Sequence, residues 1–238
     1  MPLEKIKSSK PYVTIIDGTL KQKVTKETEG AELREWELKD GTKGSKWELS
    51  YQSISGLICD LRLKEGEYGQ TLEVDFGDAI LSMNTESRYF GDFVKKLIKV
   101  DVDKEISVSP FDFVGDKGKP IKGVTIYNDG VKMLNYYWDA TEGKPCNNMP
   151  QPVGDTSKFD NDDWKVYFIG VKKFLIEELK TVMDKVEEAD NKAQTSFDQP
   201  ADDIPTINIA EELEEAGMDI KEGDETYTMH YNDLKNGR

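Results

Sequence analysis

Apolar and polar residues alternate along residues 47–63, and this period of two is typical of a half-buried β-strand. The alternation predicts one long strand that bends at Gly56, because glycine tolerates the backbone geometry of a bulge. In such a strand every second side chain points into the core, and we assign Trp36, Trp47 and Tyr51 to these inward positions. β-prone runs separated by turn residues predict further strands over residues 12–16, 20–24, 72–76, 79–84, 105–113, 121–127 and 131–138.

The hydrophobic period changes to that of a helix in two places. Apolar residues recur at helical spacing in residues 89–98, and Thr85 or Ser87 is the expected N-cap. A long amphipathic helix is predicted from 162 to 189, with Asn161 as its cap. Its apolar stripe must pack either on the body or on a second copy, and consists of Trp164, Tyr167, Phe168, Val171, Leu175, Leu179, Val182, Met183 and Val186.

The order of these elements indicates the fold class. From Trp47 onward the chain reads as three strands, one helix and a closing set of strands, which is the order of an oligonucleotide-binding (OB) barrel. Other small β-barrels and sandwiches with one helix give a similar order. We expect a β-rich α+β fold: an OB-like five-stranded barrel with an extra N-terminal hairpin over 1–140, a linker over 141–160, the amphipathic helix over 161–190, and a disordered acidic tail over 191–238.

Charge is distributed unevenly along the chain. The net charge is −15, from 47 acidic and 32 basic residues. Residues 187–238 contain 15 acidic and 4 basic residues, so most of the excess lies in the last fifth of the chain. The body is therefore nearly balanced and has enough cations to form a basic face, while the tail is a tethered polyanion held at high local concentration near that face.

Composition argues against several classes of function. Two cysteines and the single His230 cannot build a disulfide framework or a zinc site. There is no P-loop, nucleophile elbow or zinc-protease motif, and no carboxylate cluster that indicates a nuclease. No apolar run has the length of a membrane span, and the N-terminal residues lack a signal-peptide core. We expect a cytoplasmic binding protein that is not an enzyme and uses no metal or cofactor.

Aromatic and basic residues are interleaved in the predicted strands and loops. Proteins hold single-stranded nucleic acid by stacking bases on aromatic rings and by neutralising the backbone with cations. In an OB barrel the ligand crosses strands 2 and 3 between two loops, here residues 65–69 and 114–120. The predicted nucleic-acid-binding residues are Lys46, Arg62, Lys64, Tyr68, Arg88, Lys117, Lys119, Lys122, Tyr127, Lys132, Tyr136 and Trp138.

The tail contains a short motif, Asp202-Asp203-Ile204-Pro205. This segment resembles the acidic tip of phage and bacterial OB-fold single-stranded DNA-binding proteins, although Thr206 stands where that family has a final Phe, and more residues follow. The resemblance implies that these four residues bind replication or recombination proteins, and that the tail competes with DNA for the basic groove.

These observations together predict sequence-independent binding of single-stranded DNA during replication or recombination, with the acidic tail modulating DNA or partner binding. The sequence leaves two alternatives open. One is a structural or assembly protein, such as a virion or scaffold protein, that forms homo-oligomers through helix 161–190. The other is an acidic DNA mimic that inhibits a basic partner.

Overall fold

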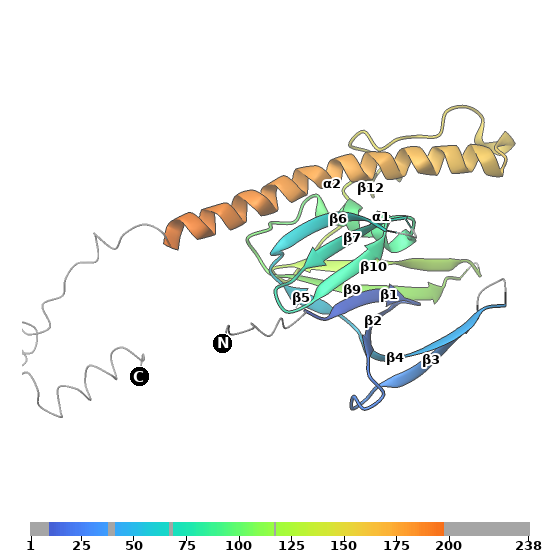
Figure 1. Ribbon diagram of the computed structural model, residues 1–238. Coiled ribbons are helices and arrows are strands. Elements are labelled where there is room, and N and C mark those ends of the chain that lie inside the picture. The colour runs from blue at the N-terminus through green and yellow to red at the C-terminus, as the bar shows by residue number, and fades with distance from the viewer. Residues whose placement is uncertain (1–9, 38–40, 67–68, 117, 198–238) are drawn as a thin grey trace, which may run out of the picture. The chain divides into compact units, whose positions relative to one another are not determined.

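The computed structural model describes residues 10–37, 41–66, 69–116 and 118–197. It is β-rich, and a helix ends the described part of the chain (Figure 1). The helices are α1 (Arg88–Leu97), the short 3-10 helix η1 (Thr156–Lys158) and α2 (Asn161–Phe197). The strands are β1 (Tyr12–Ile16), β2 (Thr19–Val24), β3 (Glu32–Glu37), β4 (Lys43–Tyr51), β5 (Ile54–Gly56), β6 (Asp60–Gly66), β7 (Gly69–Asp75), β8 (Ile80–Asn84), β9 (Ile106–Val114), β10 (Pro120–Asn128), β11 (Val131–Lys132), β12 (Trp138–Asp139) and β13 (Lys144–Pro145).

The described strands form two main sheets and a short ribbon. The first sheet has the order β3-β4-β2-β1-β8-β7-β6, the second has the order β11-β10-β9-β5, and β12 pairs with β13. In the seven-stranded sheet β1 and β8 are parallel neighbours, so the predicted N-terminal hairpin of β1 and β2 is an integral part of this sheet. The hairpin is therefore not an appendage, and a closed five-stranded barrel is not seen among the described strands.

The hydrophobic core lies on one face of the seven-stranded sheet, as the alternation predicts. Leu61 on β6, Val74 on β7, Leu81 on β8 and Val13 on β1 are register neighbours, and all four are buried. The opposite parity of β6, β7 and β8 forms the outer face and carries mainly polar side chains, such as Arg62, Glu73 and Ser82. Alternation thus separates a packed face from a polar face across these strands.

The prediction of one continuous strand over residues 47–63 is wrong. The chain leaves the first sheet after β4, contributes β5 to the second sheet, and returns to the first sheet as β6. Gly56 lies at this change of sheet with a φ of 154°, and a Cβ on it would approach the Phe76 carbonyl oxygen to 3.0 Å. The predicted strand over 131–138 is also interrupted: only its first two residues, in β11, and its last residue, Trp138 in β12, are in strands.

Strand β10 pairs with β9 on one side, but on the other side only its last two residues pair with a described strand, β11. Helix α1 covers the middle of β10 on that second side. Of the two predicted caps, Ser87 is the N-cap, and its hydroxyl accepts a hydrogen bond from the backbone N–H of Phe90. The Asp92 carboxylate accepts the backbone N–H of Val124 at 2.7 Å, and the Lys96 ammonium donates to the carbonyl oxygen of the same residue. This ion-paired helix turn therefore satisfies both backbone polar groups of Val124 at this strand edge.

Helix α2 packs on the body through the second part of its predicted stripe. Val171, Leu175, Leu179, Val182 and Val186 are buried in the common core. The hydroxyl of the buried Tyr137 donates to the Glu178 carboxylate at 2.7 Å, and Phe174 packs edge-on against the Tyr137 ring. The sequence left open whether the stripe packs on the body or on a second copy, and this part of the stripe packs on the body.

The start of α2 differs from the prediction in two ways. Asp160 rather than Asn161 caps the helix, because its carboxylate accepts the backbone N–H groups of Asp162 and Asp163. Phe168, assigned to the stripe, is 59% exposed and stacks on Trp164. Among the described residues no helix is sufficiently long and apolar to cross a membrane.

Candidate nucleic-acid interface

The hairpin formed by β3 and β4, called the arm here, continues the seven-stranded sheet beyond its core (Figure 1). Trp36 and Tyr51 were expected in the core, but they are 36% and 39% exposed, and Trp47 is half-buried. The reason is that side chains of the arm alternate between its two faces, as in any strand, but few residues of the body pack against either face. Its aromatic side chains are therefore available at the surface.

A buried carboxylate organises the cations of the arm. Glu48 on β4 is only 3% exposed, and Arg34 donates to it through two guanidinium nitrogens at 2.6 and 3.1 Å. The Lys46 ammonium lies 3.0 Å from the same carboxylate. Burial alone raises the pKa of Glu48, but the hydrogen bonds from Arg34 and Lys46 outweigh it and hold the pKa below its ordinary value.

The turn between β1 and β2 links the arm to the second sheet electrostatically. The pKa of Arg34 is raised by its hydrogen bond to Glu48 and further by the Asp17 carboxylate of this turn. Asp17 also adds to the raised pKa of Lys122 on β10, whose main cause is the hydrogen bond to Asp112. Arg34 and the predicted residue Lys122 therefore lie on separate sheets but share Asp17 as an electrostatic neighbour, and the predicted residue Lys46 joins this region through Glu48, which also binds Arg34.

Close packing fixes this turn against the second sheet. A Cβ on Gly18, which has a φ of 72°, would overlap the backbone of β9 at Asp112. The backbone N–H of Gly18 donates to the Tyr89 hydroxyl of α1 at 2.9 Å. Arg88, another predicted residue, is exposed next to Tyr89 at the start of α1. We call the region formed by Arg34, Lys46, Asp17, Asp112 and Lys122, together with Trp36, the arm site.

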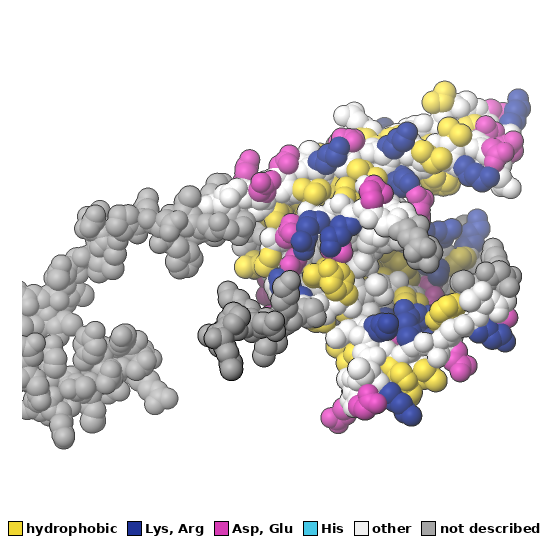
Figure 2. All heavy atoms as spheres, viewed as in Figure 1, with side chains coloured by type: hydrophobic (Ala, Val, Ile, Leu, Met, Phe, Trp, Pro, Cys, Tyr) yellow, Lys and Arg dark blue, Asp and Glu magenta, His cyan; other side chains and the backbone are white. Residues whose placement is uncertain are grey.

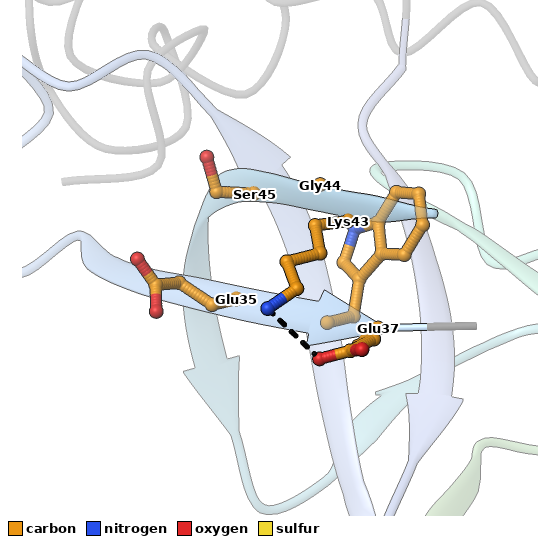
Figure 3. Close-up of a pocket in the computed structure, with 6 residues that line it drawn as sticks. Glu35, Glu37, Lys43, Gly44 and Ser45 are labelled. Atoms are coloured by element: carbon orange, nitrogen blue, oxygen red, sulfur yellow. Dashed lines mark ion pairs between the residues drawn. The ribbon is translucent and has the colours of Figure 1, made fainter. Parts of the chain in front are cut away.

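Trp36 borders an open pocket near the end of the arm (Figure 3). The pocket has a volume of about 470 Å³ and is lined by residues 35–37 of β3 and 43–45 of β4. The indole of Trp36 lies directly over Gly44, its register partner, where no larger residue leaves room for the ring. An ion pair of 3.2 Å between Lys43 and Glu37 crosses the pocket.

A second group of predicted residues lies at the opposite end of the same sheet. Arg62 and Lys64 are on the outer face of the edge strand β6. Arg62 pairs with Asp60 at 2.9 Å, and Lys64 pairs with Glu73 at 2.7 Å. With strands about 4.8 Å apart, six strand spacings separate β3 from β6, roughly 29 Å. The structure therefore does not bring these two residues into the arm site.

A third group belongs to the second sheet and the segment after it. Tyr127 and Lys132 are register partners on β10 and β11, and both are exposed. Tyr136 is half-buried, with the Lys99 ammonium 4.5 Å from its ring centre. Trp138 on β12 is 48% exposed. Lys119 is exposed beside the start of β10. Outside the described residues lie Tyr68, Lys117 and the predicted partner-binding residues Asp202, Asp203, Ile204 and Pro205.

Cations and carboxylates alternate over the visible surface. Figure 2 shows Lys and Arg side chains in separate groups with acidic side chains between them. In the described part of the chain, no three His, Cys, Asp or Glu side chains are placed to hold a metal ion. The arrangement offers charge-assisted hydrogen bonds and aromatic faces, which are groups that bind ligands.

Sequence reasoning did not select Arg34 or Trp36 for this site. Arg34 lies in the charged run Glu32–Glu37, and the sequence alone does not show that this run pairs with β4 and so places Arg34 opposite Lys46. Trp36 was excluded by its assumed inward parity. The signal that was available is Gly44, because a glycine inside a strand often marks a close approach by another group.

Comparisons with known proteins identify no relative: no family model, curated protein or solved structure matches this chain.

Proposed function

We propose that this protein binds single-stranded DNA without sequence preference, and that the arm site is where the strand enters its surface. The observation that carries the proposal is the arm site itself: Arg34 and Lys46 are register partners on the arm, where Trp36 is exposed, and Lys122 on the second sheet shares the carboxylate of Asp17 with Arg34 as an electrostatic neighbour. Guanidinium and ammonium groups suit phosphates, and an exposed indole suits any base.

The internal ion pairs shape how such binding works. Glu48, Asp17 and Asp112 already neutralise the three cations, so a phosphate must compete with these carboxylates. The carboxylates also hold the cations in position before the strand arrives. We expect modest affinity, contributed partly by stacking at about 1–3 kcal/mol per base, and a steep loss of affinity with added salt.

The order of the body elements adds support. Strands β6, β7 and β8, helix α1, and strands β9 and β10 follow one another as the elements of an OB fold do. We propose that they are an opened OB-like barrel, in which the pairing of β8 with β1 and the capping of β10 by α1 replace the barrel closure. The biological setting we propose is replication or recombination in a bacterial or phage-infected cell.

The direct test is a fluorescence anisotropy titration with a labelled single strand of about 30 nucleotides and the matching duplex. Measurements at two salt concentrations separate counterion release from other contributions. The single strand is expected to bind more tightly than the duplex, and its affinity is expected to fall with salt. Absence of binding at low salt would exclude the proposed function.

Matched variants locate the site. Trp36→Leu is expected to weaken binding by roughly 5- to 100-fold if the indole stacks on a base, whereas Trp138→Leu, which alters another exposed tryptophan, leaves affinity unchanged. Lys122→Gln is compared in the same way with Lys132→Gln. A loss confined to Trp138→Leu and Lys132→Gln would move the interface to the second sheet and refute the arm site.

The proposed tail function is tested by truncation after Phe197, where α2 ends. Residues 198–238 contain twelve acidic and three basic residues, so truncation removes nine net negative charges. If the tail competes with DNA, the truncated protein binds single strands more tightly at low salt, and the gain shrinks as salt screens both competitors. A peptide of residues 198–238 added in trans should then displace DNA. Equal affinities before and after truncation would contradict autoinhibition.

A second candidate function is that of an assembly protein. The exposed apolar residues Val166 and Ile169 near the start of α2 favour it, because they are 71% and 50% exposed without packing on the body. An assembly protein that does not bind DNA would show concentration-dependent association and a flat anisotropy titration.

A further inference from the structure

Helix α2 has a second apolar face that the body does not cover. The buried stripe includes Val171, Leu175 and Leu179, and successive helix residues turn by about 100°. Val166 therefore points directly away from the body and Ile169 lies about 120° from the centre of the buried stripe, in agreement with their exposure of 71% and 50%. Figure 2 shows hydrophobic side chains exposed along this part of α2.

Charged residues flank this outward face in a self-complementary order. One turn before Val166 lies Asp162, which pairs with Lys165 of the same helix at 2.6 Å, and one turn after Ile169 lies Lys173; both Asp162 and Lys173 are exposed. Asp162 and Lys173 are equally distant in sequence from the midpoint between Val166 and Ile169. The face therefore reads acidic, apolar, apolar, basic along about 17 Å of helix.

This order suits one partner in particular, a second copy of the same helix running antiparallel. A two-fold axis through the midpoint brings Val166 of each chain opposite Ile169 of the other. The same axis places each Asp162 opposite a Lys173, so the interface has two apolar contacts and two ion pairs of opposite charge. A parallel pairing would instead place like charges together.

Gly170 adds an independent observation. Glycine within a helix costs about 1 kcal/mol relative to alanine, and a Cβ at this position would meet no atom of the described chain within 4 Å. Packing within the chain therefore gives no reason for a glycine here. A small residue beside Val166 and Ile169 lets a second helix approach closely.

We infer that the protein forms an antiparallel homodimer through the outward face of α2 made of Asp162, Val166, Ile169 and Lys173. The inference does not depend on DNA binding. Two apolar residues per chain make a small interface compared with the roughly 800 Å² per partner of a standard one, so the dimer dissociates on dilution. Each dimer would carry two arm sites.

Charge exchange tests the geometry. Sedimentation velocity of the full chain over a range of concentrations should show a monomer–dimer equilibrium. Asp162→Lys and Lys173→Asp, each alone, place like charges opposite one another and should weaken dimerisation at least tenfold. An equimolar mixture of the two single variants should associate again, because both ion pairs re-form in the heterodimer. This rescue also excludes misfolding as the cause of the loss.

The controls use the same charge changes elsewhere on α2. Asp184→Lys lies on the same outward side but about 25 Å from the midpoint, and Lys185→Asp lies on another side. Both should dimerise like the unaltered chain. A protein that stays monomeric at the highest soluble concentration would overturn the inference. A dimer that is insensitive to the charge exchange, or that the mixture fails to restore, would also overturn it.

Discussion

The two ends of the seven-stranded sheet share one hydrogen-bonded ladder but differ in what lies beneath them. At the body end, β1, β8, β7 and β6 bury one face against α1, α2 and the second sheet. At the arm end, β3 has one half-buried side chain, Arg34, and five exposed ones. The same alternation of apolar and polar residues thus marks a core in one region and a surface in the other. Strand periodicity fixes which residues share a face but does not show whether that face is covered.

The largest expected difference concerns apolar truncation at the two ends. Leu81→Ala removes a side chain with no exposed surface in the body, and we expect a loss of about 2.5–5 kcal/mol in the free energy of unfolding. Leu33→Ala alters a residue of the arm that is 47% exposed, and we expect a loss below about 0.5 kcal/mol. Urea denaturation of both variants measures the difference. Equal losses would mean that the arm packs as tightly as the body.

The next effect concerns how each end satisfies its strand edges. On β10 the edge is capped by the Asp92 carboxylate, which accepts the Val124 backbone N–H, whereas β3 is an edge strand of the arm. Asp92→Ala leaves that N–H without its acceptor, and we expect a loss of about 2 kcal/mol. Hydrogen exchange should show faster exchange at Val124. Unchanged exchange there would show that water or another group replaces the carboxylate.

How far the sequence predicts this structure depends on the same contrast. Helix α1, its cap at one of two predicted residues, and the inward residues of β6 and β7 are local or periodic features, and all were predicted. The parallel pairing of β1 with β8 and the exposure of Trp36 depend on contacts between distant segments, and neither was predicted. Lys46 and Lys122 were selected individually for their charge, but the pairing of Lys46 with the buried Glu48 and the position of Lys122 near Asp17 became evident only in the folded chain.

A smaller effect is expected for the buried carboxylate of the arm. Glu48→Gln removes the charge that pairs with Arg34 and Lys46, and because these cations are 30% and 32% exposed, water compensates part of the loss. We expect a loss of about 1–2 kcal/mol at pH 7.

The pH dependence of this loss has a definite sign. The pKa of Glu48 is depressed in the folded protein, so its ionisation stabilises the fold above its unfolded pKa of about 4.3. That contribution disappears as pH falls through the lower folded pKa. The difference in free energy of unfolding between the unaltered chain and Glu48→Gln should therefore be largest at neutral pH and should disappear in acid. A difference that stays constant to pH 3 would show that Glu48 contributes by packing and not by charge.

A small effect on stability is also expected at the pocket of the arm, where Trp36 contacts Gly44. A methyl group at Gly44 occupies the space of the indole, so Gly44→Ala must displace the ring. Because Trp36 is already 36% exposed, the ring can move into solvent, and we expect a loss below about 1 kcal/mol. Acrylamide quenching should report a more accessible tryptophan, and Trp36→Phe in the same background should abolish the change. If the indole is a stacking surface only when held flat on the strand, Gly44→Ala also weakens single-strand binding while leaving stability nearly unchanged. A large loss of stability would instead mean that Trp36 holds the arm together, as the side chains of the body hold the core.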